Sequence, residues 1–339
     1  MTATMEPTYD AIVLAGDRRD SHTVFGENKA FLEIDGAPLL AHVLSALDRA
    51  PSVRRAIVVG DPERLRQVLA GPARRGLRID VTVVPQEDNL WANFWVAYIQ
   101  TLSPATRERI ASGESPDEAA TPEERDGRVL ALSGDIPLVQ PSEIEAFLEA
   151  AAASGADYAA GLTSEASLEP FYPADDRPGI RMAYFQLREG RFRQNNLHLA
   201  RPLRVEHRER IERMYRHRYQ RHPLDAIRLG IEIIRTRAVG LSILSGFLLL
   251  HLALKLDLAG WRRASDFLRR FLPATRVDDA ISRMLGGKFR LVCVPSPGAA
   301  LDVDRESDFE ALRGRFGEWR GWLASSASSP SERRSSPSS

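Results

Sequence analysis

The sequence has little cysteine, no excess of charge and no leader-like N-terminus, and each shortage excludes a class of protein. A single cysteine, Cys293, excludes an internal disulfide and a cysteine-rich metal site. The 46 basic and 46 acidic residues balance, so no net field favours nonspecific binding of nucleic acid. The opening residues, MTATMEPTYD, lack the basic region and apolar run of a signal peptide, which makes the reducing cytoplasm the expected compartment.

The most informative segment that is present begins with AIVLAG at residues 11–16. An apolar run of this length that ends in a small residue and glycine is typical of a buried parallel strand entering a tight turn. The polar loop that follows carries Arg18, Arg19 and Lys29. Phosphates usually bind where such a strand passes to a helix, so these cations are candidates for phosphate contacts. For the two arginines, a solvated loop without a ligand is an equally open interpretation.

Strand-like and helix-like segments then alternate at a spacing that predicts a parallel sheet. The segment 103–126 is rich in Pro, Glu, Ser and Ala, and we expect it to be a mobile or variable surface excursion. The expected strands are 11–14, 56–60, 79–84, 129–132, 158–162, 180–187, 196–200, 288–294 and 301–303, and the expected helices are 62–70, 90–102, 142–151 and 307–315.

Two further motifs place acids where strands are expected to end. In LSGDIPL at residues 132–138, an apolar strand delivers Asp135 to its C-terminal end, where parallel sheets bind ligands. In ALDVDRESDF at residues 300–309, Asp302 and Asp304 follow the last expected strand. Capping of a turn or of a neighbouring helix is the alternative role for Asp135 and Asp304.

Together the three motifs resemble those of the nucleotidyltransferase superfamily that includes the MobA-like molybdopterin guanylyltransferases and the sugar-phosphate and alcohol-phosphate nucleotidyltransferases. Its pattern is a strand, LAGG, a glycine-rich basic loop, PK and LxxxxGxPLL, followed by GDxP and a late DIDTPEDL segment. This chain departs from the pattern in three places: LAGD replaces LAGG, the loop DRRDSHTVFGEN has little glycine, and Asn28 replaces the proline before Lys29.

The resemblance implies an α/β fold with a Rossmann-like, mostly parallel sheet of the glycosyltransferase-A-like type, interrupted by a helical insertion. It implies that Asp135 holds the Mg²⁺ that bridges the triphosphate and that Asp304 is the second ligand. Asp302 is in reserve, on the expectation that strand alternation lets only one of the two acids face the ion. The other implied contacts are those of Lys29, Arg18 and Arg19 with the phosphates and of Leu14, Ala15 and Gly16 with the nucleotide.

Amide side chains are the candidates for contacts with the base and the acceptor. In the resembling family the region 84–93 approaches the base and ribose, and Gln86, Asn89 and Asn93 carry groups that can donate and accept on a base edge. Helix capping by Asp88 or Asn89 is an equally open role.

The family usually builds its acceptor pocket within the region 157–199. Asn196 is the candidate for an acceptor contact there. An ordinary turn at Asn195 and Asn196 is the preferred interpretation of this pair.

From residue 201 to 286 the pattern becomes helical and rich in arginine. The run 238–254 has no formally charged side chain, but a bilayer span needs about 20 apolar residues, so we expect a buried or interfacial helix. Flanking arginines leave open a peripheral contact with an anionic membrane, and packing on the sheet or in a homodimer is the alternative. The expected division is a nucleotidyltransferase core at 1–200, the insertion at 201–286, core completion at 287–323 and a disordered Ser/Pro/Arg tail at 324–339.

We therefore predict a cytoplasmic, Mg²⁺-dependent nucleotidyltransferase that joins the nucleotidyl group of a nucleoside triphosphate to a phosphorylated small molecule or lipid precursor and releases pyrophosphate. Peripheral membrane contact and a homodimer stay open at this point. No nucleic acid partner is expected. One alternative is a glycosyltransferase that uses a nucleotide sugar, because residues 302–304 imitate its DxD motif, although that motif normally lies mid-chain. The other is a catalytically degenerate protein that binds nucleotide or a membrane surface.

Overall fold

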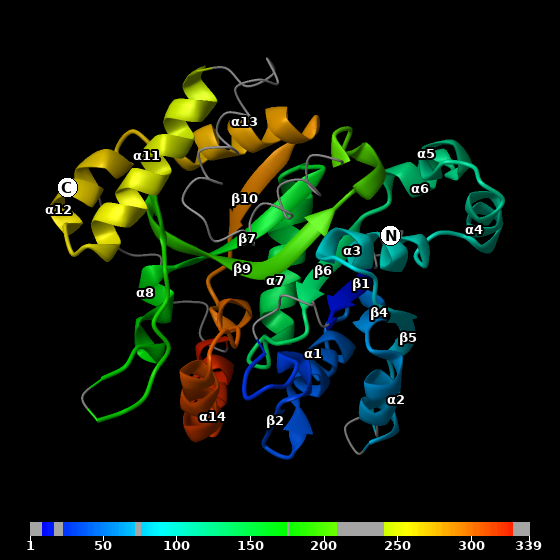
Figure 1. Cartoon of the computed structure of the whole chain (residues 1–339), viewed down its shortest axis with the longest axis horizontal. Coiled ribbons are helices and arrows are strands. Elements are labelled where there is room, and N and C mark those ends of the chain that lie inside the picture. The colour runs from blue at the N-terminus through cyan, green and yellow to red at the C-terminus, as the bar shows by residue number, and fades with distance from the viewer. Residues whose placement is uncertain (1–8, 17–22, 72–75, 175, 209–240, 328–339) are drawn as a thin grey trace, which may run out of the picture.

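The computed structural model describes residues 9–16, 23–71, 76–174, 176–208 and 241–327 (Figure 1). Its centre is an eight-stranded sheet in the order β10-β7-β9-β6-β1-β4-β5, with β8 paired to β9. The strands are β1 (Tyr9–Leu14), β4 (Val53–Gly60), β5 (Asp80–Pro85), β6 (Val129–Ser133), β7 (Tyr158–Ser164), β8 (Phe185–Leu187), β9 (Gly190–Ala200) and β10 (Phe289–Cys293), and a separate hairpin joins β2 (Glu33–Ile34) to β3 (Ala37–Pro38).

Most neighbours in the sheet run parallel. The strands β6, β1, β4 and β5 are parallel, and so are β10 and β7. The long strand β9 runs antiparallel to both β6 and β7 and joins the two parallel groups. The expected mostly parallel α/β architecture is therefore confirmed.

Helices cover both faces of the sheet and bury its central strand. On one face Val13 packs in a cluster with Leu44 of α1 (Leu39–Asp48) and Phe147 of α7 (Pro141–Ala153), and on the other Ile12 packs with Tyr98 of α3 (Leu90–Ile99). Successive side chains of a strand point to opposite faces, so an unbroken apolar run such as β1 fits a strand covered on both sides. The helices are α1 (Leu39–Asp48), α2 (Pro62–Ala70), α3 (Leu90–Ile99), α4 (Pro104–Ala111), α5 (Pro116–Ala119), α6 (Pro122–Asp126), α7 (Pro141–Ala153), α8 (Glu165–Leu168), α11 (Leu241–Leu258), α12 (Arg262–Arg269), α13 (Ala274–Leu285) and α14 (Glu306–Ala327).

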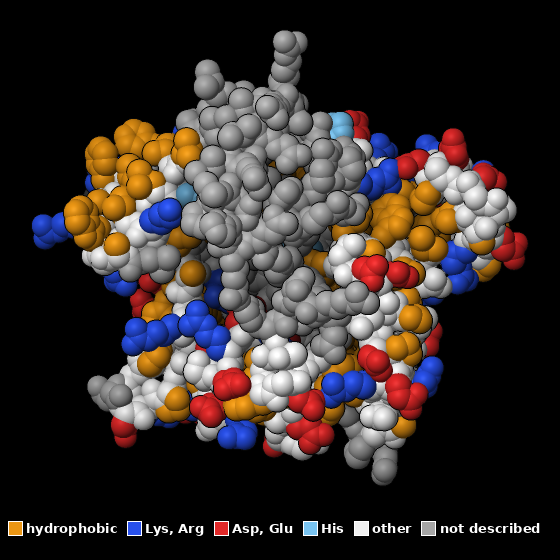
Figure 2. Space-filling model, viewed as in Figure 1, with side chains coloured by type: hydrophobic (Ala, Val, Ile, Leu, Met, Phe, Trp, Pro, Cys, Tyr) orange, Lys and Arg blue, Asp and Glu red, His pale blue; other side chains and the backbone are white. Residues whose placement is uncertain are grey.

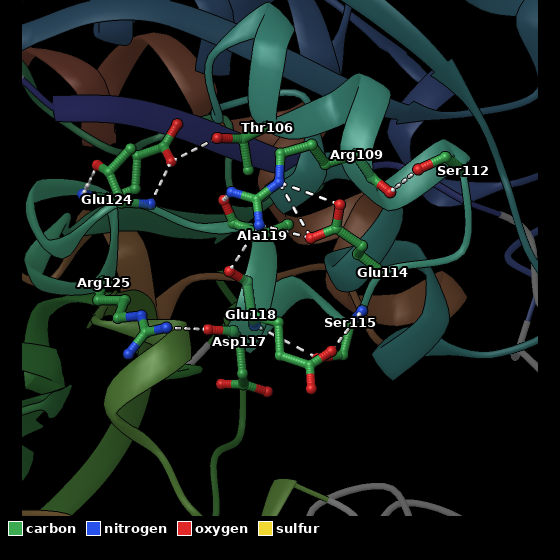
Figure 3. Close-up of polar contacts among 11 residues, drawn as sticks. Thr106, Arg109, Ser112, Glu114, Ser115, Asp117, Glu118, Ala119, Glu124 and Arg125 are labelled. Atoms are coloured by element: carbon green, nitrogen blue, oxygen red, sulfur yellow. Dashed lines mark hydrogen bonds and ion pairs between the residues drawn. The ribbon is translucent and has the colours of Figure 1, made fainter.

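The surface excursion at 103–126 folds into three short helices, α4, α5 and α6, instead of an irregular segment. Each begins with proline at its first turn and is capped by Ser103, Ser115 or Thr121. Arg109 of α4 points toward Glu114 and donates to the carbonyl oxygen of Ala119 at 2.8 Å (Figure 3). Composition predicted a mobile or variable surface excursion, but Ser/Thr-Pro followed by glutamate, as at the starts of α5 and α6, is a sequence signature of a helix start.

Three helices lead from the insertion back to the sheet. α11 and α12 form a hairpin, and α13 packs on β10, where Leu285 and Phe289 share a buried cluster. The described part of the expected insertion is thus helical, while residues 209–240 lie outside the described residues. Within the part of the chain that the structure describes, none of the helices is both long enough and apolar enough to span a bilayer.

Three expected elements differ from the structure. The expected strand at 301–303 is an extended segment outside the sheet that follows a 3-10 turn, η5 (Gly298–Ala300). The expected strand at 180–187 is limited to β8, and α14 is one helix that includes both 307–315 and the amphipathic stretch after it. Leu301 and Val303 are buried, so their apolar character reflects packing and not strand pairing. The remaining 3-10 turns are η1 (Lys29–Phe31), η3 (Glu169–Phe171) and η4 (Pro202–Arg204).

Candidate nucleotide site

Two motif loops meet at the carboxyl ends of the neighbouring strands β1 and β6. The chain continues from β1 to β4 on one side, and β6 lies on the other, so this is the switch point where ligands of α/β sheets bind. The amide nitrogen of Gly134 donates to the carbonyl oxygen of Leu14 at 3.0 Å. A Cβ at Gly134 would lie 3.1 Å from the Cβ of Ala15, so glycine keeps the two loops in close contact.

Asn28, which stands where the family pattern has proline, forms two structural hydrogen bonds before Lys29. Its Oδ1 accepts from the amide of Ala30 at 2.9 Å and caps η1, and its Nδ2 donates to the carbonyl oxygen of Ala15 at 2.9 Å. These two buried hydrogen bonds fasten the start of η1 to the end of β1 and thereby position Lys29. Arg18 and Arg19 lie outside the described residues.

Five charged side chains from distant parts of the sequence converge beside these loops. Lys29 Nζ lies 2.8 Å from Asp304 Oδ1 and 3.7 Å from Asp135 Oδ2. Arg193 Nη2, from β9, lies 2.5 Å from Asp302 Oδ1 and 3.8 Å from Asp304 Oδ2. We call these five residues the switch-point cluster. Sequence reasoning missed Arg193, for which the only signal was the alternating arginines of RFRQ in what became β9.

The environment of the switch-point cluster raises the pKa of some of its members and lowers that of another. Burial, with a further contribution from Asp302, raises the pKa of Asp135 to about 6, although Lys29 opposes the shift. Burial alone would lower the pKa of Lys29, but the carboxylates of Asp135 and Asp304 outweigh it and leave that pKa raised. Burial would raise the pKa of Asp304, but the adjacent Lys29 holds it below its ordinary value. Asp135 is therefore the acid whose charge is least compensated.

The two late acids lie on the same side of their segment. Both Asp302 and Asp304 contact Arg193, whereas Leu301 and Val303 are buried against the core. Side chains two residues apart share a face in an extended chain, so strand alternation does not separate these two acids. Which of them faces a metal ion stays a prediction.

The side chains of the candidate acids Asp135 and Asp304 do not act as helix caps. The N-cap of α7 is Gln140, which forms a capping box with Glu143, so Asp135 has no part in it. Asp304 directs its carboxylate to Lys29 and Arg193, and α14 begins at Glu306.

Two amide side chains after β5, those of Asn89 and Asn93, form structural hydrogen bonds. Asn89 is the N-cap of α3, accepting from the amide of Ala92 at 2.9 Å, so the capping role is the one realised. Asn93 is buried and its Oδ1 accepts from the amide of Glu87 at 2.5 Å. A Cβ at Gly16 would lie 2.9 Å from Gln86 Oε1 and 3.0 Å from Asn93 Nδ2. Gly16 is thus needed where this loop packs on the end of β1.

Asn195 and Asn196 lie within β9, so the expected turn at this pair is wrong. Asn195 is buried and donates to Thr163 Oγ1 at 3.3 Å. Asn196 Nδ2 donates to the carbonyl oxygen of Ala299 at 3.1 Å. Asn196 therefore holds η5, three residues before Asp302, against β9.

Glu143 holds the same turn from the other side. Its Oε1 and Oε2 accept from the amide of Ala299 at 3.0 and 3.1 Å, across 156 residues of sequence. Burial raises the pKa of Glu143 to about 8. A Cβ at Gly298 would lie 2.3 Å from the carbonyl oxygen of Leu138, so only glycine allows this approach. Sequence reasoning missed Glu143, whose only signal was a glutamate at the third position of α7.

The carboxylates of the switch-point cluster are the available oxygen donors for a hard cation. Among the residues that the structure describes, no group of three or more His, Cys, Asp or Glu side chains is placed to hold a metal ion on its own. Any cation bound here would need additional ligands.

A doubly covered, mostly parallel sheet with a charged cluster at its switch point defines a Rossmann-like α/β protein of the nucleotidyltransferase type. The chain belongs to the MobA-like NTP transferase domain family, whose model matches residues 11–198, so the resemblance inferred from the motifs is confirmed. The matched region includes Lys29, Asp135 and Arg193, and the late acids lie beyond it.

Two relatives illustrate the similarity. The 2-C-methyl-D-erythritol 4-phosphate cytidylyltransferase of Rubrobacter xylanophilus is 43% identical over 61 residues, which are 18% of this chain and only 25% of the relative. The structure of a hypothetical transferase from Thermus thermophilus covers 89% of this chain and 99% of its own, with a TM-score of 0.57 and 23% identity. The first match is local, and the second shows that the fold extends over nearly the whole chain.

Proposed function

We propose that this protein is a Mg²⁺-dependent nucleotidyltransferase that transfers a nucleoside monophosphate from a nucleoside triphosphate to a phosphorylated acceptor. The observation that carries the proposal is the convergence of Lys29, Asp135 and Asp304 at the carboxyl ends of β1 and β6. Membership of the NTP transferase family supports the same reaction class.

The donor set fits Mg²⁺. This ion is usually bound by one or two carboxylates and completes its octahedral shell with water and substrate phosphate oxygens. Asp135 and Asp304 both lie close to Lys29 Nζ, at 3.7 and 2.8 Å, so their oxygens face a common point. The ion would supply charge neutralisation at the phosphates, and a nucleotide would have to complete its coordination.

The chain's own residues position and neutralise the reacting groups. An oxygen of the acceptor phosphate attacks the α-phosphorus, the bond from that phosphorus to the bridging oxygen of the β-phosphate breaks, and pyrophosphate leaves with the electron pair. Lys29 compensates charge that builds on the phosphates. No side-chain nucleophile is needed, since catalysis here consists of positioning and charge compensation.

The donor and acceptor follow less directly from the site. The relative from Rubrobacter xylanophilus is named a cytidylyltransferase, which makes CTP the first donor to test. Arg193 contacts both Asp302 and Asp304 in the switch-point cluster, and its guanidinium would suit the phosphate of an acceptor. Asn196 supports the nearby turn η5 and would act on the acceptor only indirectly.

A thermal-shift screen tests the proposal. The melting temperature is measured with CTP, GTP, UTP, ATP and dTTP in turn, each with and without Mg²⁺, because a ligand that binds only the folded state raises it. We expect one nucleotide to stabilise the protein in a Mg²⁺-dependent way and then to release pyrophosphate when an acceptor is present. Stabilisation by a nucleotide sugar but by no triphosphate would instead identify a glycosyltransferase.

Comparison of Asp302→Asn with Asp304→Asn identifies the second acid. We expect Asp304→Asn to increase the Mg²⁺ concentration needed for turnover more than Asp302→Asn does, because only Asp304 also contacts Lys29. The reverse order would assign the ligand to Asp302 and leave Asp304 to position the lysine.

A further inference from the structure

The hairpin of α11 and α12 presents large apolar side chains to solvent on the side of the molecule away from β5. Figure 2 shows apolar side chains gathered over this hairpin. Trp261, Leu248, Phe267 and Phe271 are each more than half exposed, at 67, 58, 57 and 52%. We call these four residues, with the less exposed Leu252, the hairpin surface. Single exposed apolar residues are ordinary, but a group with three aromatic rings marks an interaction site.

The hairpin is fixed to the core, so this exposure is built into the fold. The hydroxyl of Ser265 donates to the carbonyl oxygen of Ala253 at 2.9 Å where both residues are buried between the helices. Arg191 of β9 pairs with Asp257 of α11 at 3.2 Å and with Asp266 of α12 at 3.4 Å. A half-buried arginine therefore holds both helices against the sheet.

The charged side chains of the hairpin differ in exposure and pairing. Its two acids, Asp257 and Asp266, both pair with Arg191, and Asp266, whose side chain is 45% exposed, also pairs with Arg269 at 3.0 Å. From residue 246 to 271, the charged residues with the greatest overall exposure are all basic: Lys255, Arg262, Arg263 and Arg270. The hairpin therefore combines exposed aromatic rings with an excess of positive charge, since Asp266 is neutralised by its two arginine partners.

An anionic bilayer surface fits this combination better than the other occupants do. Helices that lie in a bilayer interface bury aromatic and aliphatic side chains while basic side chains contact anionic lipid headgroups. A second copy docked symmetrically would place these arginines against one another, and such like-charge contacts are unfavourable. No described helix is suited to span the bilayer, which agrees with contact in the plane of the interface.

We propose that the hairpin surface docks this protein on an anionic lipid bilayer. The docking residues lie between 248 and 271, so they extend well beyond the run 238–254 that the sequence pointed to. The proposal does not rest on the nucleotidyltransferase activity. A peripheral enzyme held in this way would meet acceptors that are themselves in the membrane.

Sedimentation with lipid vesicles tests the proposal on the full chain. Vesicles of phosphatidylcholine alone are compared with vesicles that also contain phosphatidylglycerol, at low and high salt. We expect the protein to sediment only with the anionic vesicles and to be released by salt. Arg262→Glu with Arg263→Glu should weaken binding at least about thirtyfold, because each basic residue near such a surface contributes roughly fivefold. The matched control, Arg49→Glu with Arg66→Glu, reverses two exposed charges elsewhere and should leave binding unchanged.

Tryptophan fluorescence tests the apolar part of the hairpin surface. Anionic vesicles should shift the emission to the blue, and Trp261→Phe should remove the shift while vesicles still bind the protein. Absence of binding at low salt, or binding that neither the charge reversals nor Trp261→Ser with Phe267→Ser weakens, would overturn the proposal. So would a vesicle-free dimer in sedimentation velocity that Trp261→Ser dissociates. If the apolar variants unfold, the charge reversals alone decide, since their side chains are exposed.

Discussion

Two clusters that both pair cationic side chains with carboxylates differ in exposure and in the separation of their members along the sequence. In the excursion α4–α6, Arg109 and Glu114 are exposed and five residues apart in the sequence. Arg109 Nη2 lies 2.5 Å from Glu114 Oε2 (Figure 3). In the switch-point cluster, Lys29 and Asp304 are 275 residues apart and are brought together by the sheet. The first cluster organises its own segment, whereas the second assembles distant segments at one point.

The ionisation of the acids shows what this difference means. A hydrogen bond from Arg109 lowers the pKa of Glu114, so that carboxylate is stabilised in its ordinary charged form. Burial moves the pKa of Asp135 in the opposite direction, to about 6. A buried acid whose charge is left under-compensated at the switch point of a sheet is a candidate functional residue, because a ligand can supply the missing positive charge. The substitutions below test whether that distinction holds.

The largest effect is expected from Asp135→Asn. The amide keeps the size of the side chain but removes the negative charge, so it should abolish favourable contacts with a divalent cation. We expect turnover with Mg²⁺ to fall by about 10²–10³-fold, as for the loss of one group that stabilises transition-state charge. Pyrophosphate release measures this effect, with circular dichroism to check the fold.

Asp126→Asn is the matched control for that substitution. Asp126 pairs with Arg204 at 2.5 Å on the surface of the excursion side and should be replaced without loss of turnover. Full activity of Asp135→Asn, or an equal loss in both variants, would contradict the distinction between the two clusters.

Lys29→Ala is expected to have the next largest effect. A hydrogen bond to a charged group contributes roughly 1.5–3 kcal/mol, so kcat/KM for the triphosphate should fall by about tenfold to a hundredfold. Lys288→Ala, which removes a lysine bound to the carbonyl oxygen of Ser154, is the control. Unchanged kcat/KM in Lys29→Ala would exclude a phosphate contact for this residue.

The pH profile of the same variant sharpens the test. Asp135 must be ionised to bind a cation, and its pKa of about 6 means that wild-type activity should fall as the pH is lowered through about 6. Lys29 opposes the upward shift of that pKa, so Lys29→Ala should move the fall in activity to higher pH. A shift to lower pH would show that another group controls the acid limb.

The sequence predicted the parts of the site that depend on local pattern. The apolar runs of β1 and β6 and the residues directly after them could be placed because strand ends share one edge of a parallel sheet. Arg193 and Glu143 could not be placed, since their roles depend on the reversed strand β9 and on a contact between α7 and η5. Likewise, composition indicated only a surface excursion at 103–126, whereas the capping boxes at Ser115 and Thr121 start two of its helices.

Substitution of Glu143 tests whether this acid stabilises the turn η5 through its hydrogen bonds to Ala299. Glu143→Ala leaves the buried amide of Ala299 without its acceptor and should cost about 1–3 kcal/mol of unfolding free energy, along with activity. Glu143→Gln keeps an acceptor and should preserve most of both. Chemical denaturation with each variant measures the difference, and equal stability of the two would exclude the clamp on η5.

The pH dependence of stability separates these two variants further. Burial raises the pKa of Glu143 from an ordinary 4.5 to about 8 in the folded protein. Its contribution to stability is therefore complete below the ordinary value and is lost as the pH rises through about 8. Glu143→Gln should remove this component, so that its unfolding free energy falls less between neutral and alkaline pH than that of the wild type.

The smallest effect is expected from Arg109→Ala in the excursion. Exposed ion pairs contribute little because water screens them, so we expect a small decrease in melting temperature and unchanged kcat/KM. Arg193→Ala is the counterpart in the switch-point cluster, where loss of the half-buried contact to Asp302 should reduce turnover clearly. An equal loss of turnover in Arg109→Ala and Arg193→Ala would mean that the excursion contacts the substrate. Exposure and separation in sequence would then no longer distinguish a structural charge cluster from a functional one.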